Sequence, residues 1–238
     1  MKFDNPTLVT LTAPTCSGKS YLLNHVVDEL KLFDRIVSTT TRTMRLGERE
    51  GVDYYFIDRA KSEALEASGA FFELIEFNNT RYGVTHEEMD GKMGAERAPM
   101  IILEPQGLAI YEKECRKRGW DIFKIYVHTP EKMRLERLKH RLVTDVWGCI
   151  DAARSSHVRD KSTTDTLKAG AAKAISEYER RFISITGPER GWQNTTSWDA
   201  IIPGYDVEEA VACIERGIKW RNRQVAEPIA YTSVDLPL

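Results

Sequence analysis

Three consecutive segments near the start of the chain read TLVTLT (residues 7–12), APTCSGKS (13–20) and YLLNHVVDEL (21–30). The first segment is short and rich in β-branched residues, which is typical of a buried strand. The third segment spaces its apolar residues so that they fall on one side of a helix: Leu22, Leu23, Val26, Val27 and Leu30. The sequence therefore predicts a strand, a loop and a helix in that order.

The middle segment matches the phosphate-loop pattern G-x-x-x-x-G-K-[ST] at every defined position except the first, where alanine replaces glycine. In such a loop, successive N–H groups and the helix N-terminus form a cradle for nucleotide phosphates. Lys19 would reach the outer phosphates as a catalytic residue, and the Ser20 hydroxyl would ligate Mg²⁺. A chance Gly-Lys-Ser at an ordinary helix start is the alternative, and the flanking strand and helix argue against it. We therefore predict that ATP binds with Mg²⁺ to Ala13, Pro14, Thr15, Cys16, Ser17, Gly18, Lys19 and Ser20.

Cys16 stands where many phosphate loops carry glycine. If the backbone needs a positive φ at this position, the loop stores strain of about 1–2 kcal/mol. A thiol beside a helix N-terminus can also be redox-sensitive, because the thiolate is favoured there. We favour the simpler interpretation that Cys16 is a small filler residue.

The composition is that of an ordinary globular protein, with 238 residues, 34 Lys+Arg, 36 Asp+Glu, a net charge of −2 and 42% hydrophobic residues. This near-neutral balance argues against a protein whose main partner is nucleic acid. The four cysteines are far apart, without the spacing of a zinc site or of a disulfide framework. No segment approaches the roughly 18 apolar residues of a membrane span, and no signal peptide is recognisable. We expect a soluble cytoplasmic protein without a membrane partner.

Strand-like and helix-like segments alternate again in the second half of the chain, which favours a parallel sheet covered on both faces. Residues 35–93 differ, because several β-type runs surround one polar helix, and they read as a small α+β insertion. The segment at about 142–173 is rich in Ser, Thr, Asp, Lys and Arg and is expected to be mobile and charged. We predict an α/β, P-loop NTPase three-layer fold whose core comprises residues 1–34 and 94–222, with a C-terminal tail at 223–238.

Two arginines, Arg42 and Arg45, stand three residues apart behind the hydroxyl run at 38–41. Guanidinium groups suit bidentate binding of a phosphate, although a solvated basic turn would have the same composition. The segment follows the phosphate loop and precedes, in this order, GVDYYF, FELIEF, RYGVT and EPQG. Over nearly the whole chain this order resembles the guanylate kinase family.

The resemblance implies a nucleoside monophosphate kinase with a core, an acceptor-binding insertion and a lid, which transfers the γ-phosphoryl group of ATP to GMP or dGMP. Ser38 and Glu73 fall on positions that read guanine in the family. A carboxylate suits this role because guanine offers two adjacent donors, N1–H and the 2-amino group. Glu73 facing solvent and Tyr82 filling space remain open alternatives. The family's acceptor-phosphate positions fall here on Arg42, Arg45, Tyr54 and Tyr82.

The chain departs from the family pattern at several acceptor positions. Val84 stands where the family has a hydroxyl residue that donates to guanine O6, and Thr85 follows it. Glu104 replaces the second acid of the family's D-x-D, whose first acid is absent, and Met44 replaces a proline. We keep Val84 and Glu104 among the predicted substrate-binding residues. Base specificity is the expectation most exposed to these changes, because sites that read polar groups are sensitive to such replacements.

Arg137 and Arg141 match the start of the family's lid arginine pattern, on a helix that follows Pro130. With Lys19 they are the predicted catalytic residues, and their role would be to stabilise charge on the transferring phosphoryl group. Arg154 or Arg159 would supply a partner from the other side of the lid, and a solvated helix face explains these two equally well. The lid segment is longer than is usual in the family.

Two other functions remain open. A related kinase could phosphorylate another acceptor: a modified deoxynucleotide, a hydroxymethylpyrimidine free or in DNA, or a ribose bisphosphate. A non-catalytic guanylate-kinase-like binding module would lack the phosphate-loop lysine, which is present here as Lys19. The expected partners are nucleotide substrates, with nucleic acid as a less favoured substrate, and the expected assembly is a monomer or a homodimer.

Overall fold

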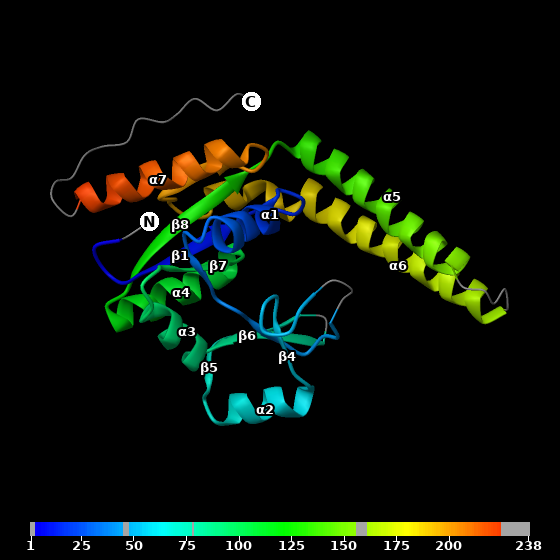
Figure 1. Cartoon of the computed structure of the whole chain (residues 1–238), viewed down its shortest axis with the longest axis horizontal. Coiled ribbons are helices and arrows are strands. Elements are labelled where there is room, and N and C mark those ends of the chain that lie inside the picture. The colour runs from blue at the N-terminus through cyan, green and yellow to red at the C-terminus, as the bar shows by residue number, and fades with distance from the viewer. Residues whose placement is uncertain (1–2, 45–47, 78, 156–160, 225–238) are drawn as a thin grey trace.

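The computed structural model describes residues 3–44, 48–77, 79–155 and 161–224 of the chain (Figure 1). Five strands form a parallel sheet in the order β2-β7-β1-β8-β9. Their bounds are β1 Thr7–Thr12, β2 Asp34–Arg35, β7 Pro99–Ile102, β8 Asp121–His128 and β9 Ala200–Pro203. The prediction of a parallel central sheet is confirmed.

Helices cover both faces of this sheet. Successive side chains of β1 point to opposite faces, so β1 contributes to an apolar cluster on each side. Val9 and Leu11 pack in a cluster with α1 and α7, whereas Leu8 packs in a second cluster with α3 and α4. The three layers are therefore helices, sheet and helices, as predicted. The helical elements around this sheet are α1 Lys19–Asn24, the π-helical turn η1 His25–Glu29 that continues it, α3 His86–Met93, which falls within the predicted insertion, α4 Pro105–Arg118, the 3₁₀ segment η2 Pro188–Asn194 and α7 Val207–Gln224.

A second, four-stranded sheet lies below the core in Figure 1, in the order β4-β3-β6-β5. Its bounds are β3 Thr39–Thr40, β4 Tyr55–Phe56, β5 Phe71–Phe77 and β6 Thr80–Thr85, with α2 Arg59–Ala67 between β4 and β5. Side chains cap the helices that adjoin this sheet: Asp58 accepts from the N–H of Lys61 at 2.7 Å, and Thr85 from the N–H of Glu88 at 3.2 Å. This sheet lies within the predicted insertion at residues 35–93.

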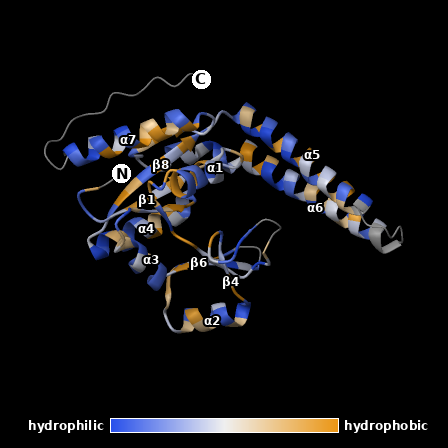
Figure 2. Ribbon diagram, viewed as in Figure 1, coloured by the Kyte–Doolittle hydropathy of each residue, from blue (hydrophilic) through white to orange (hydrophobic). Residues whose placement is uncertain are grey.

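Two long helices, α5 (Glu131–Ser155) and α6 (Lys161–Thr186), pack against each other and project from the core as an arm (Figure 1). The sequence predicted no helix across residues 142–173, and the described part of that segment is helical. The arm mixes hydrophilic and hydrophobic residues along its length (Figure 2). A helix that meets one partner needs only a narrow apolar seam, so the usual amphipathic pattern is weak.

Among the described helices, none combines the length and the apolar character that a membrane span requires. Most of the predicted tail at 223–238 lies outside the described residues. Arg45 and Arg159, two of the predicted site residues, also lie outside them.

Candidate active site

The phosphate loop joins β1 to α1 at the carboxyl ends of the parallel strands, where ligands of open α/β sheets bind. The N–H of Ser17 donates to the carbonyl of Pro14 at 3.2 Å and closes a tight turn. Cys16 has φ of 60° and Gly18 has φ of 97°. Glycine adopts a positive φ freely, but cysteine does not, so the loop stores strain of about 1–2 kcal/mol at Cys16.

Lys19 begins α1, and its Nζ lies 3.4 Å from the carbonyl oxygen of Ala13. Burial lowers the pKa of Lys19, while the carboxylates of Glu189 and Glu104 act in the opposite direction. The first N–H groups of a helix have no acceptor within it. A half-buried ammonium group beside such N–H groups is a site suited to phosphate.

The residues of this loop fit Mg²⁺ held together with a nucleotide. Ser20 is exposed at the start of α1, and the Glu104 carboxylate is near enough to raise the pKa of Lys19. Within the described ranges, no group of three or more His, Cys, Asp or Glu side chains forms a metal cage. Mg²⁺ in nucleotide sites is commonly bound by one or two protein oxygens and by the phosphates, which needs no such cage.

Hydrogen bonds and close packing from distant segments hold the phosphate loop. Thr129 donates to the carbonyl of Ser17 at 2.9 Å, and Arg137 donates to the carbonyls of Cys16 at 3.2 Å and Gly204 at 3.1 Å. Glu189 accepts from the N–H and the hydroxyl of Thr15. Gly204 is packed so closely that a Cβ there would lie 2.1 Å from the carbonyl oxygen of Ser17. The loop conformation therefore depends on residues that the sequence pattern does not contain.

The predicted lid arginines occupy different environments. Two terminal nitrogens of Arg137 hold backbone carbonyls, and Arg141 is exposed, 3.8 Å from Asp145. Arg154 is exposed and lies over the ring of Trp147. The catalytic roles of these arginines stay predictions.

The structure brings another arginine to Lys19. Arg181 on α6 is half-buried and close enough to contribute to lowering the pKa of Lys19. It bonds to Glu177, whose pKa falls to about 2 because Arg180 and Arg181 both donate to it. The adjacent pair Arg180-Arg181 was visible in the sequence, but only the structure shows that Arg181 lies near Lys19.

Arg42 lies in an aromatic and acidic surrounding on the second sheet. Its guanidinium donates to both carboxylate oxygens of Glu48, at 2.7 and 2.5 Å, and lies 4.8 Å from the ring centroid of Tyr54. The ring centroids of Tyr54 and Tyr82 are 6.1 Å apart, and the two rings meet edge to face. Burial raises the pKa of Tyr54, so its hydroxyl is a neutral donor near neutral pH. Three of the four predicted acceptor-phosphate residues thus form one cluster.

The predicted guanine-reading residues belong to the second sheet, in which β6 lies between β3 and β5. Glu73 pairs with Val84 across β5 and β6, and Ser38 immediately precedes β3. Val84 is 1% exposed in the apolar cluster that contains Tyr111, so its side chain offers no polar contact. The specific roles of these three residues stay predictions.

Helix α4 connects the two groups of residues. Glu104, near Lys19, is the residue before its first turn, and Tyr111 on the same helix donates to Glu73 at 3.4 Å. Burial raises the pKa of Glu73, and the bond from Tyr111 lowers it. The sequence did not single out Tyr111, because a buried aromatic at helical spacing reads as core.

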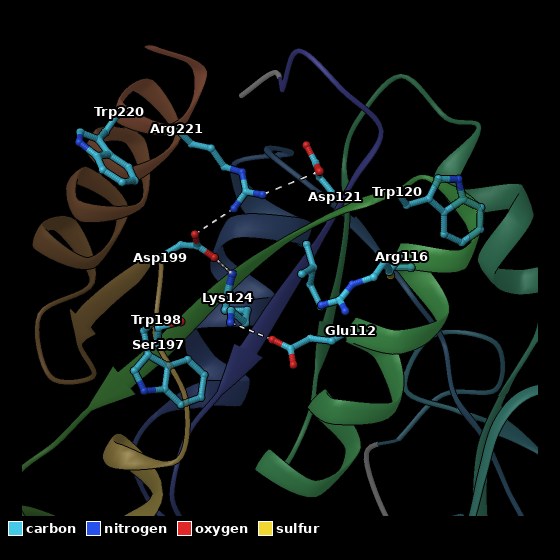
Figure 3. A pocket seen from close by; sticks show the side chains of 12 residues that line it. Glu112, Arg116, Trp120, Asp121, Lys124, Ser197, Trp198, Asp199, Trp220 and Arg221 are labelled. Carbon is cyan, nitrogen blue, oxygen red and sulfur yellow. Dashed lines mark hydrogen bonds and ion pairs between the residues drawn. The ribbon is translucent and has the colours of Figure 1, made fainter. Parts of the chain in front are cut away.

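A pocket of about 540 Å³ lies elsewhere, between α4, β8, α7 and the segment that precedes β9 (Figure 3). Asp121 at its edge pairs in register with Thr7, so the pocket lies at the amino end of the sheet, opposite the phosphate loop. Its charges bond to one another: Arg221 to Asp199 at 2.9 Å and Lys124 to Glu112 at 2.8 Å. The pocket is separate from the candidate active site.

Comparison with known proteins identifies the family. The family model described as guanylate kinase matches residues 5–165. A guanylate kinase from Rhodopseudomonas palustris is 30% identical over 138 residues, which span 58% of this chain and 60% of that protein. One from Anaplasma phagocytophilum is 28% identical over 203 residues, 85% of this chain and 80% of that protein.

A crystal structure of the guanylate kinase from Anaplasma phagocytophilum has a TM-score of 0.52 to this chain at 22% identity, and the match covers 92% of this chain and 87% of the other. This likeness supports the fold. Because the family model matches more than half of the residues, the chain belongs to the guanylate kinase family.

Proposed function

We propose that the protein transfers the γ-phosphoryl group of ATP to GMP or dGMP. The observation that carries this proposal is the arrangement of two groups of residues around α4. A lysine-bearing phosphate loop lies near its first turn, and a half-buried carboxylate, Glu73, is bonded to Tyr111 further along the helix. Membership of the guanylate kinase family supports the same activity.

The donor side of the reaction uses the phosphate loop. Residues 13–20 hold the ATP phosphates through backbone N–H groups, and Lys19 neutralises charge on the outer phosphates. Mg²⁺, when bound at the Ser20 hydroxyl, adds positive charge beside the same phosphates. The carboxylate of Glu104 lies near Lys19, at the same edge of the site.

The acceptor side uses the second sheet. Arg42, with the hydroxyls of Tyr54 and Tyr82, binds the acceptor phosphate. Glu73 accepts from guanine N1–H and the 2-amino group. Ser38 immediately precedes β3, which belongs to the same sheet and is separated from the strand of Glu73 by β6. In this proposal residues 35–93 bind the acceptor, and the α5–α6 arm, which contains the described part of residues 142–173, acts as the lid.

The chemical step needs little from the protein beyond position and charge. An acceptor phosphate oxygen attacks the γ-phosphorus, the bond to the β-phosphate oxygen breaks, and ADP leaves with that electron pair. The attacking oxygen is already ionised near neutral pH, so no general base is required. Lys19 and the nearby Arg181 stabilise the charge that spreads over the transferring group.

The decisive experiment measures ADP formation from Mg-ATP with GMP, dGMP, AMP, dCMP, dTMP, hydroxymethyl-dUMP and a hydroxymethyluracil-containing oligonucleotide. We expect turnover with GMP or dGMP, and loss of turnover in Lys19→Ala. Turnover only with a pyrimidine or with the oligonucleotide would replace the proposed acceptor. Undiminished turnover in Lys19→Ala would refute the phosphate-loop assignment.

A further inference from the structure

A buried ion pair touches the phosphate loop from the far end of the sequence. Glu189 in η2 is 4% exposed, and its carboxylate accepts from Arg134 Nη1 on α5 at 3.0 Å. The same carboxylate accepts from the backbone N–H of Thr15 at 2.9 Å and from its hydroxyl at 2.5 Å. Among the described residues, the side chain of Glu189 bonds to the loop and to the arginine that neutralises it.

The buried pair of Glu189 and Arg134 is not required to attach η2 to α5. An exposed pair, Arg190 with Glu131, joins the same two elements through two bonds of 2.8 Å. Burying two charges costs free energy unless they are well paired and make further hydrogen bonds. Attachment alone therefore does not explain a second, buried pair at the same junction. What distinguishes Glu189 from Arg190 is its contact with Thr15.

Thr15 precedes the strained residue of the loop. Cys16 has φ of 60°, a conformation that an L-residue adopts only when its surroundings hold it. Glu189 fixes the backbone and hydroxyl of Thr15 on one side of Cys16, and Arg137 fixes the carbonyl of Cys16 on the other. Together these contacts hold the peptide unit between Pro14 and Thr15, the side chain of Thr15 and the peptide unit that follows Cys16.

We propose that Glu189, oriented by Arg134, is a positioning residue that holds the phosphate loop in its strained, anion-binding conformation before a nucleotide arrives. The inference rests on the proposed function only in taking ATP as the ligand of the loop. A carboxylate close to a phosphate site would repel the ligand, and the bond from Arg134 offsets that charge. Glu189 also acts to raise the pKa of Lys19, which favours the protonated ammonium.

The experiment measures the Kd of Mg-ATP by calorimetry without an acceptor, and the KM values of ATP and acceptor by turnover. Glu189→Gln keeps the shape but weakens both bonds to Thr15 and the pair with Arg134. We expect its Kd and KM for ATP to rise tenfold or more, with the acceptor KM within twofold of wild type. The control is Glu131→Gln, which removes the exposed pair at the same junction and should change neither value more than twofold.

A rescue separates positioning from general destabilisation. Glycine adopts a positive φ without strain, so Cys16→Gly reduces the need for the clamp. Added to Glu189→Gln, it should recover at least threefold of the lost ATP affinity. If Glu189→Gln does not fold, Thr15→Val removes only the hydroxyl contact and should raise the Kd about threefold.

Wild-type ATP affinity in Glu189→Gln, or in Thr15→Val where that variant stands in for it, would overturn the inference. So would equal losses in Glu189→Gln and Glu131→Gln, or a loss that Cys16→Gly does not relieve. A failure of the proposed function has a different signature: the wild-type protein then phosphorylates no guanine nucleotide, while the ATP affinities of the variants still follow the expected order.

Discussion

The hydroxyl of Tyr111 on α4 donates to the carboxylate of Glu73 on β5, 3.4 Å away, and joins the core to the second sheet. Tyr111 is fully buried, and its pKa lies well above the usual 10.0 because of burial and the neighbouring carboxylate. The phenol therefore stays protonated and acts as a donor at every pH of interest. The same helix begins beside Glu104, near Lys19, so α4 sets the spacing between the two proposed substrate sites.

Tyr111→Phe should change the pH dependence of acceptor binding. Burial raises the pKa of Glu73 above its ordinary 4.5, and the bond from Tyr111 partly opposes this. In the proposed function the ionised carboxylate binds guanine, so acceptor affinity should increase as pH rises through the pKa of Glu73. Tyr111→Phe should move that rise to higher pH. The measurement is kcat/KM for GMP across the acid limb in both proteins.

Stability should show the opposite sign for the same carboxylate. Because folding raises the pKa of Glu73, the contribution of Glu73 to the free energy of unfolding is fully present below pH 4.5 and is lost as pH rises through its pKa in the folded protein.

Removing the Tyr111 hydroxyl should also lower the free energy of unfolding by about 0.5–1.5 kcal/mol. Tyr126→Phe, at another buried tyrosine, is the control for Tyr111→Phe. If the acid limb of kcat/KM for GMP moves equally in both variants, the role of Tyr111 is contradicted.

Arg42→Lys should weaken acceptor binding while leaving ATP binding intact. Lysine keeps the charge but loses the planar pair of donors, and charged hydrogen bonds contribute about 1.5–3 kcal/mol. We expect the acceptor KM to rise roughly tenfold to a hundredfold.

The control for Arg42 is Arg59→Lys. Arg59 also lies by the second sheet and pairs with two carboxylates, Glu63 and Glu76, but is exposed. The acceptor KM should stay within twofold of wild type in Arg59→Lys. An acceptor KM that is unchanged in Arg42→Lys would remove Arg42 from the acceptor site.

The sequence predicted most accurately what is local. The strand, loop and helix of residues 7–30 and the parallel sheet follow from short-range patterns, and both are confirmed. The sequence indicated that the loop would store strain if Cys16 had a positive φ, and in the structure the φ of Cys16 is positive.

What the sequence did not predict depends on contacts between distant segments. Thr15 and Glu189 are 174 positions apart, and Tyr111 and Glu73 are 38 apart. One sequence contains no record of which segments pack together, and each of these residues has a simple surface or core explanation when it is taken alone. The sequence predicted the helix after Pro130 but no helix across residues 142–173, because the apolar seam of the arm is too narrow to show in the composition.

Gly204→Ala should disturb the phosphate loop from a site outside it. A Cβ at Gly204 would lie 2.1 Å from the Ser17 carbonyl and 2.3 Å from Thr129 Oγ1, so the β9–α7 connection or the loop must move. We expect the free energy of unfolding to fall by about 1–3 kcal/mol and the KM for ATP to rise. Denaturant unfolding and steady-state kinetics measure the two effects.

Gly191→Ala is the control for this substitution, since Gly191 lies in nearby η2 and a Cβ there would meet nothing within 4 Å. It should change stability by less than about 0.5 kcal/mol. Equal effects of the two substitutions would mean that the close packing of Gly204 against Ser17 has no influence on nucleotide binding.

Arg181→Ala should lower kcat more than Arg141→Ala does. The sequence predicted Arg141 as a lid arginine, but it is exposed and 3.8 Å from Asp145, whereas Arg181 is near enough to Lys19 to affect its pKa. Losing a positive charge that is aimed at the transferring phosphoryl group commonly costs about 10²–10³ in rate, and we expect that loss for Arg181 and less than tenfold for Arg141. Single-turnover rates at saturating ATP and GMP separate this effect from binding. If Arg141→Ala shows the larger loss, the arm must rearrange before transfer and carry α5, rather than α6, over the phosphates.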